Sequence, residues 1–127
     1  EVKSDRRVVN LENTDARSLN NRIISDPVDL IVCDVSFISV KKVLLPCIAL
    51  SKTGGQLLCL FKPQFEVGPG KLKKTGVITD VDLRIKLLRQ MENWFLNLKD
   101  WKFKGSIQSS LPGREGNREF FILAEKI

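Results

Sequence analysis

Residues 28–40 read "VDLIVCDVSFISV" and indicate the kind of sheet that this chain builds. The apolar run from Leu30 to Cys33 predicts a strand, and continuous apolar strands are typical of parallel sheets covered on both faces. The run stops at Asp34, an acid at the point where the strand ends. Either this carboxylate caps the helix that follows at the surface, or Asp34 acts on a bound molecule.

Helices and strands alternate on both sides of this run. The pattern predicts a short strand around Val8, Val9 and Leu11, strands over 28–33, 56–61, 102–109 and 118–125, and helices over 39–51 and 79–98. The central βαβαβ order predicts an α/β fold with an open, mostly parallel sheet, helices on both faces and an antiparallel last strand. At 127 residues the chain is one domain or part of one.

The first predicted helix has its apolar residues at the i, i+3 and i+4 spacing. We expect Ser39 to cap its start, Pro46 to bend it and the "TGG" at 53–55 to turn the chain after it. The face that should be buried carries Val40, Val43, Leu44, Cys47 and Ile48.

The second helix should open with a capping box formed by Thr79 and Asp82. Its expected buried face carries Val81, Ile85, Leu88, Met91, Phe95 and Leu98. Between the helices, residues 63–78 hold two prolines, three glycines and three lysines, which predicts a long exposed loop.

Composition narrows the classes of function. The net charge of +6 favours polyanionic partners such as nucleic acid. The chain has no histidine, which excludes a Ser-His-Asp triad, a Cys-His dyad and a His-ligated metal site within it. Its three cysteines lie in apolar runs without metal-like spacing, as expected of buried, reduced thiols in a cytoplasmic protein. No apolar run approaches the roughly 20 residues that span a membrane, and the charged start does not resemble a signal peptide.

Four ionisable residues stand at the ends of predicted strands. Ligands of open α/β sheets bind outside the carboxyl ends of the strands, where Asp15, Asp34 and Lys62 fall. Glu119 opens the last strand, and Pro63 should hold Lys62 in an extended conformation. An acid, a lysine and a second acid can handle a proton together. Alone, each has a plainer explanation: a helix cap, a solvated lysine, a surface charge or an Asx turn.

Four blocks of sequence carry a resemblance to a known family. They are "DVSFIS" at 34–39, "KPQFEVG" at 62–68, "GVITD" at 76–80 and "LPGREGNREFF" at 111–121. In register over nearly the whole chain, they resemble the TlyA (hemolysin A) family of FtsJ-like ribosomal-RNA 2′-O-methyltransferases, which use S-adenosylmethionine. The resemblance implies that residues 1–127 are the C-terminal part of a Rossmann-like methyltransferase domain.

The resemblance also implies roles for single residues. The FtsJ-like class uses a Lys-Asp-Lys-Glu tetrad, and Asp34, Lys62 and Glu119 match its last three members. Lys62 would lie nearest the ribose 2′-hydroxyl as base or steering group, with Asp34 orienting it beside the cofactor and Glu119 in support. Asp15, in "NTDAR", resembles the acid that contacts the adenine of the cofactor.

The basic loop is a candidate for contacts with ribosomal RNA or ribosomal subunits. Its lysines are Lys71, Lys73 and Lys74. They are suited to contacts with RNA phosphates, although a merely solvated loop explains them equally well.

Several parts of the family pattern do not occur in these residues. By the resemblance, the first tetrad lysine, the glycine-rich cofactor loop, the acid that holds the ribose and an S4-type RNA-binding domain lie upstream of residue 1. We therefore expect the isolated chain to be inactive and to bind the cofactor weakly. The segment before about Asp26 should pack loosely, or associate with another chain across an exposed strand edge.

Two alternatives to methyl transfer remain at this point. One is an RNA-binding fragment without catalysis. The other is a membrane-active hemolysin, which the mixed charges Asp82, Arg84, Lys86, Arg89 and Glu92 on the outer face of the long helix disfavour.

Overall fold

The structure is a computed structural model that describes residues 2–68, 70–72 and 74–127. Four strands, two α-helices and three short 3-10 helices make up its regular structure. In chain order they are η1 (Val2–Ser4), η2 (Ala16–Ser18), β1 (Val28–Cys33), α1 (Val40–Ile48), β2 (Ser51–Phe61), η3 (Pro63–Phe65), α2 (Val81–Leu96), β3 (Trp101–Gln108) and β4 (Phe120–Lys126).

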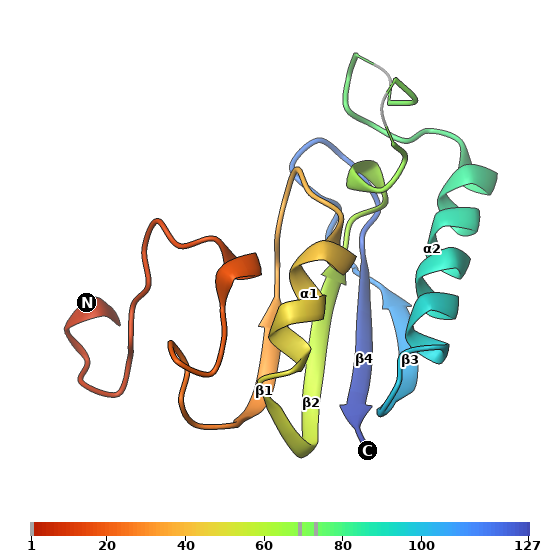
Figure 1. The fold of residues 1–127 in the computed structure, drawn as a ribbon. Coiled ribbons are helices and arrows are strands. Elements are labelled where there is room, and N and C mark those ends of the chain that lie inside the picture. The colour runs from red at the N-terminus through yellow and green to blue at the C-terminus, as the bar shows by residue number, and fades with distance from the viewer. Residues whose placement is uncertain (1, 69, 73) are drawn as a thin grey trace.

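The four strands form one sheet in the order β1-β2-β4-β3 (Figure 1). β1 and β2 are parallel, whereas β4 lies between β2 and β3 and is antiparallel to both. β1, β2 and β3 therefore run in one direction, which confirms the predicted mostly parallel α/β sheet with an antiparallel last strand. This topology brings the carboxyl ends of β1 and β2 to the same sheet edge as the start of β4.

In the described part of the chain, helices cover only one face of the sheet, which corrects the prediction of helices on both faces. Because side chains alternate along a strand and paired residues share a face, the registers divide the apolar residues into two sets. The inner set packs against both helices in one core; its buried strand members are Cys33, Leu57, Cys59, Phe61, Trp101, Phe120, Ile122 and Ala124. The outer set is exposed; it includes Leu30, Val32, Ile107, Phe121 and Leu123.

Helix α1 buries the face that its spacing predicts. Val40, Val43, Leu44 and Ile48 are buried, and Cys47 is half-buried against the core. The predicted turn at 53–55 is wrong, because β2 already begins at Ser51. Ser51 pairs with Val28 and Gln56 pairs with Leu30, so the chain between them bulges out of the sheet.

The start of α1 is capped from a distant part of the sequence. Ser39 occupies the N-cap position, but its side chain makes no capping hydrogen bond. Instead, Glu66 Oε1 accepts a hydrogen bond of 2.8 Å from Val40 N. The loop after β2 is thereby tied to the segment after β1.

Replacing Glu66 with alanine is therefore expected to destabilise the protein by about 0.5–2 kcal/mol, the usual effect of losing an N-cap acceptor. Ser39→Ala is the matched control and should change the free energy of unfolding by no more than a few tenths of a kcal/mol. Urea unfolding of the complete protein, followed by tryptophan fluorescence, measures both variants. A larger loss in Ser39→Ala than in Glu66→Ala would contradict this assignment.

Helix α2 begins one residue later than a capping box at Thr79 would place it. Its N-cap is Asp80, whose side chain accepts a hydrogen bond from Leu83 N. Its buried residues are Leu87, Met91 and Phe95. Val81 and Ile85 are 53% and 47% exposed, so their predicted burial is wrong.

The predicted strand at 8–11 is absent, and Val9 is 82% exposed. The described residues before β1 contain two 3-10 helices and run beside β1 and α1 outside the sheet (Figure 1). A strand without a neighbour has no ladder partners for its N–H and C=O groups. The segment makes local hydrogen bonds instead, such as Val8 N to Asp5 O. The expected loose packing is confirmed for residues 8–11. Association through the open edge of β1 stays a prediction.

Candidate active site

Asp34 and Lys62 meet at the carboxyl ends of β1 and β2. Lys62 Nζ lies 2.5 Å from Asp34 Oδ1 and donates a hydrogen bond of 3.1 Å to Ser36 Oγ. The Lys62 side chain is 14% exposed, whereas that of Asp34 is 63% exposed. Lys62 has the extended backbone that the following Pro63 requires. The structure thus holds a largely buried ammonium group between a carboxylate and a hydroxyl at the open end of the sheet.

Glu119 lies at the same edge, immediately before β4, and is only 7% exposed. It lines a cavity of about 250 Å³ together with Lys62 and Ser36. Burial raises the pKa of Glu119, the Lys62 charge opposes this shift, and the Asp34 charge adds to it. Within the described part of the chain, Glu119 Oε2 is buried without a hydrogen-bond partner. An unpaired buried acceptor is costly, and in a native structure it requires an explanation such as a catalytic role or a bound molecule.

Gly113 leaves room for this carboxylate. A Cβ atom at residue 113 would lie 2.3 Å from Glu119 Oε1 and 3.0 Å from the carboxyl carbon. The loop therefore passes close to the Glu119 side chain, and only glycine allows this approach without displacing it.

Phe37 was not among the predicted site residues, yet it is the most unusual residue at this edge. Its backbone is left-handed, with φ of 62°, and its side chain is 90% exposed. The ring lies 4.9 Å from that of Phe65, centre to centre, and Phe37 also lines the cavity of Lys62 and Glu119. Such backbone conformations cost about 1–3 kcal/mol and cluster at binding and catalytic sites. Nothing in the sequence pattern signals it.

Asn117, which is 3% exposed, holds the end of the basic loop, at residues 76–78, by two hydrogen bonds. Asn117 Oδ1 accepts a hydrogen bond of 2.9 Å from Ile78 N, and Nδ2 donates one of 2.8 Å to Gly76 O. Of the predicted RNA-binding lysines, Lys71 and Lys74 are exposed. Lys73 lies outside the described residues.

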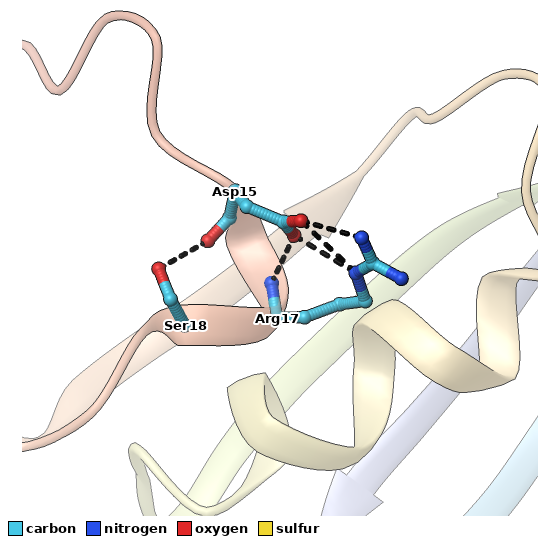
Figure 2. A network of polar contacts seen from close by, with 3 residues as sticks. All are labelled: Asp15, Arg17 and Ser18. Atoms are coloured by element: carbon cyan, nitrogen blue, oxygen red, sulfur yellow. Dashed lines mark hydrogen bonds and ion pairs between the residues drawn. The ribbon is translucent and has the colours of Figure 1, made fainter.

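Asp15 takes part in a local network (Figure 2). Its carboxylate forms an ion pair of 2.6 Å with Arg17 and accepts a hydrogen bond from Arg17 N, which caps η2. The Ser18 hydroxyl donates to Asp15 O at 2.6 Å. The side-chain hydrogen bond from Arg17 is the largest cause that lowers the pKa of Asp15, to about 2. The Asx-turn interpretation therefore holds, and the predicted contact with adenine stays a prediction.

Next to Asp15, an apolar cavity of about 360 Å³ opens between the N-terminal segment and β1. Ala16 lines one side of it, and Cys33 and Asp34 line the other. Asp34 therefore borders this apolar cavity and is also paired with Lys62. It thus connects the apolar cavity with the cavity of Lys62 and Glu119.

The comparison with protein families shows the family to which the chain belongs. The sequence model of the FtsJ-like methyltransferases matches residues 1–126. The chain belongs to the FtsJ-like methyltransferase family. This confirms the resemblance that the four sequence blocks carry to FtsJ-like methyltransferases. Two relatives show how similar individual proteins are to this chain. The 16S/23S rRNA (cytidine-2′-O)-methyltransferase TlyA of Mycobacterium tuberculosis is 39% identical over 95% of this chain, and the hemolysin A of Brachyspira hyodysenteriae is 35% identical over 94% of it.

A solved structure of a protein named as a hemolysin, from Lactococcus lactis, superimposes with a TM-score of 0.89 and 29% identity. The match covers 98% of this FtsJ-like chain and 59% of that one. The chain spans about half the length of the curated relatives it matches, 45% for the M. tuberculosis protein and 50% for the B. hyodysenteriae protein. None of the helices in the described part of the chain has the length and apolar character that crossing a bilayer requires.

Proposed function

We propose that the protein is a ribosomal-RNA ribose 2′-O-methyltransferase that uses S-adenosylmethionine, and that residues 1–127 form part of its methyltransferase domain. The glycine-rich cofactor loop, the first tetrad lysine and an S4-type domain would belong to other parts of the protein. One observation carries the proposal: a largely buried Lys62, paired with Asp34, borders the same cavity as buried Glu119 at the sheet edge.

The residues present fit the cofactor. A purine ring requires an apolar slot with hydrogen-bond acceptors at its rim, and the cavity beside Ala16 has apolar walls with Asp34 at one end. Asp15 directly precedes Ala16, which lines this cavity, and its carboxylate is about half exposed. S-adenosylmethionine supplies an activated methyl group on a sulfonium, so the protein does not need to activate the methyl donor.

The task of this chain is then to position the ribose hydroxyl. Lys62 donates a hydrogen bond to the 2′-oxygen and stabilises the negative charge that develops there as the proton leaves. Asp34 and Ser36 fix the direction of the Lys62 side chain. Glu119 borders the same cavity, and burial raises its pKa. In its ionised form this carboxylate can accept the proton that leaves the 2′-hydroxyl.

The RNA would approach over the basic loop. Lys71 and Lys74 are exposed. Lys74 lines a cavity of about 640 Å³ beside the site, which Phe37 also lines. Together with Lys73 and the net charge of +6, these two lysines provide contacts for phosphates. We assign the substrate to ribosomal RNA, free or within ribosomal subunits in the cytoplasm.

The test is methyl transfer by the complete protein. Purified ribosomal subunits are incubated with S-adenosylmethionine carrying a labelled methyl group, and the RNA is digested to nucleosides. The expected product is a nucleoside labelled on the ribose 2′-oxygen. RNA binding without any such product would favour the alternative of a non-catalytic RNA-binding protein.

The role of Asp15 has its own prediction. If its carboxylate accepts a hydrogen bond from the adenine amino group, Asp15→Ala in the complete protein should weaken S-adenosylmethionine binding by about 10- to 150-fold, as for a lost hydrogen bond to a charged group. Arg17→Ala is the control, because it removes the ion pair and leaves the carboxylate in place. Calorimetry measures both affinities. Equal losses in the two variants would assign Asp15 to the turn alone.

A further inference from the structure

Gln64 is a buried polar residue that the proposed chemistry does not use. It follows Lys62 by two residues, in η3, and is 9% exposed. No described residue donates a hydrogen bond to its buried Oε1 atom. Because buried acceptors are almost always paired, the amide requires an explanation. A bound molecule that carries a hydrogen-bond donor would supply one.

Gln64 lines two cavities. One is the cavity of about 250 Å³ that contains Lys62 and Glu119. The other is larger, about 640 Å³, and lies between η3, the basic loop and the loop before β4. Gln64, Phe37 and Phe65 border both of them. A molecule held at Lys62 can therefore extend past the Gln64 amide into the larger space.

The walls of the larger cavity suit a nucleobase. Phe37, Phe65, Val67 and Leu72 contribute apolar and aromatic surface, and Lys74 contributes a positive charge. Asn117 holds the loop that forms the far wall through its two hydrogen bonds to backbone atoms. Glu115 lines the cavity as well. Aromatic and apolar walls with the Gln64 amide and the Lys74 cation suit a base and its phosphate.

We propose that the larger cavity holds the base of the nucleotide whose 2′-hydroxyl lies at Lys62, and that the Gln64 amide hydrogen-bonds the edge of that base. This inference rests on the proposed function. A cytosine edge presents an amino group next to a ring nitrogen acceptor, which matches the acceptor and the donor of an amide. The relative from M. tuberculosis is named for cytidine.

The test combines a protein change with an RNA change. The methylated nucleotide is first mapped. The complete protein is then assayed on two RNAs, one with the normal base at that nucleotide and one with an abasic ribose. The abasic RNA keeps the 2′-hydroxyl. Gln64→Leu, similar in size, should lower kcat/KM about tenfold on normal RNA, the effect of one or two lost hydrogen bonds. It should have no effect on abasic RNA.

Gln56→Leu is the matched control, because Gln56 is exposed on β2 away from both cavities, and it should leave both rates unchanged. The affinity for S-adenosylmethionine, measured in parallel, shows that each variant is folded. An equal loss in Gln64→Leu on normal and abasic RNA would overturn the proposal. Methylation of normal RNA by the unchanged protein tests the proposed function separately.

Discussion

Lys62→Ala in the complete protein is expected to lower methyl transfer by about 100- to 10,000-fold, the range for losing a positioned group that handles a proton. The affinity for S-adenosylmethionine should stay within a few fold, because Lys62 lies in the cavity with Glu119 and not in the apolar cavity beside Ala16. Single-turnover assays with labelled cofactor measure the rate, and calorimetry measures the affinity.

The chain provides a matched control for this change. Lys52 also pairs with an acid across β1 and β2, but its partner is Asp29 and the pair lies toward the opposite end of the strands, exposed to solvent. Lys52→Ala removes the same chemical group and should leave turnover unchanged, since exposed ion pairs contribute little. Turnover by Lys62→Ala within a few fold of the unchanged protein would remove Lys62 from the mechanism.

The pairing of Asp34 with Lys62 could be predicted because it depends on local patterns. Two apolar runs predict two parallel strands, and parallel strands bring their carboxyl ends to one edge. The register that pairs Cys33 with Cys59 places the residues that follow within reach of each other. The position of β1 and the buried face of α1 could be predicted for the same reason.

The errors arise where distant residues decide the outcome. The sequence around Ser39 contains an adequate cap, but Glu66 takes the capping hydrogen bond. Val8, Val9 and Leu11 have the composition of a strand, but they have no neighbouring strand with which to pair.

The missed site residues share this property. The hydrogen bonds of Asn117 join residues 39 and 41 positions apart. The unpaired acceptor of Gln64 and the left-handed backbone of Phe37 exist only in the folded chain. No spacing rule identifies such features, whereas the geometry of the folded loops does.

Gly113→Ala should reduce methyl transfer by about 100-fold, although glycine-to-alanine changes in loops are often mild. The added methyl group would lie 2.3 Å from Glu119 Oε1, so the carboxylate must move away from its place in the cavity of Lys62. A displacement of about 1 Å at a reacting group can cost roughly 100-fold in rate. The affinity for S-adenosylmethionine and the melting temperature should change little, and Ser110→Ala, exposed in the same loop, should have no effect.

A double-mutant cycle separates displacement of the carboxylate from general damage to the loop. Aspartate is one methylene shorter than glutamate, so Glu119→Asp withdraws the carboxylate from the position that the new methyl group occupies. Glu119→Asp alone lowers the rate of methyl transfer. In that variant, Gly113→Ala should lower the rate only a few fold further, far less than the same change does in the unchanged protein. Coupling of this size is expected for groups in contact or sharing one network or cavity, and not for distant, independent sites. If the two losses simply multiply, Gly113 acts on the fold of the loop, and the position of the Glu119 carboxylate does not explain the effect.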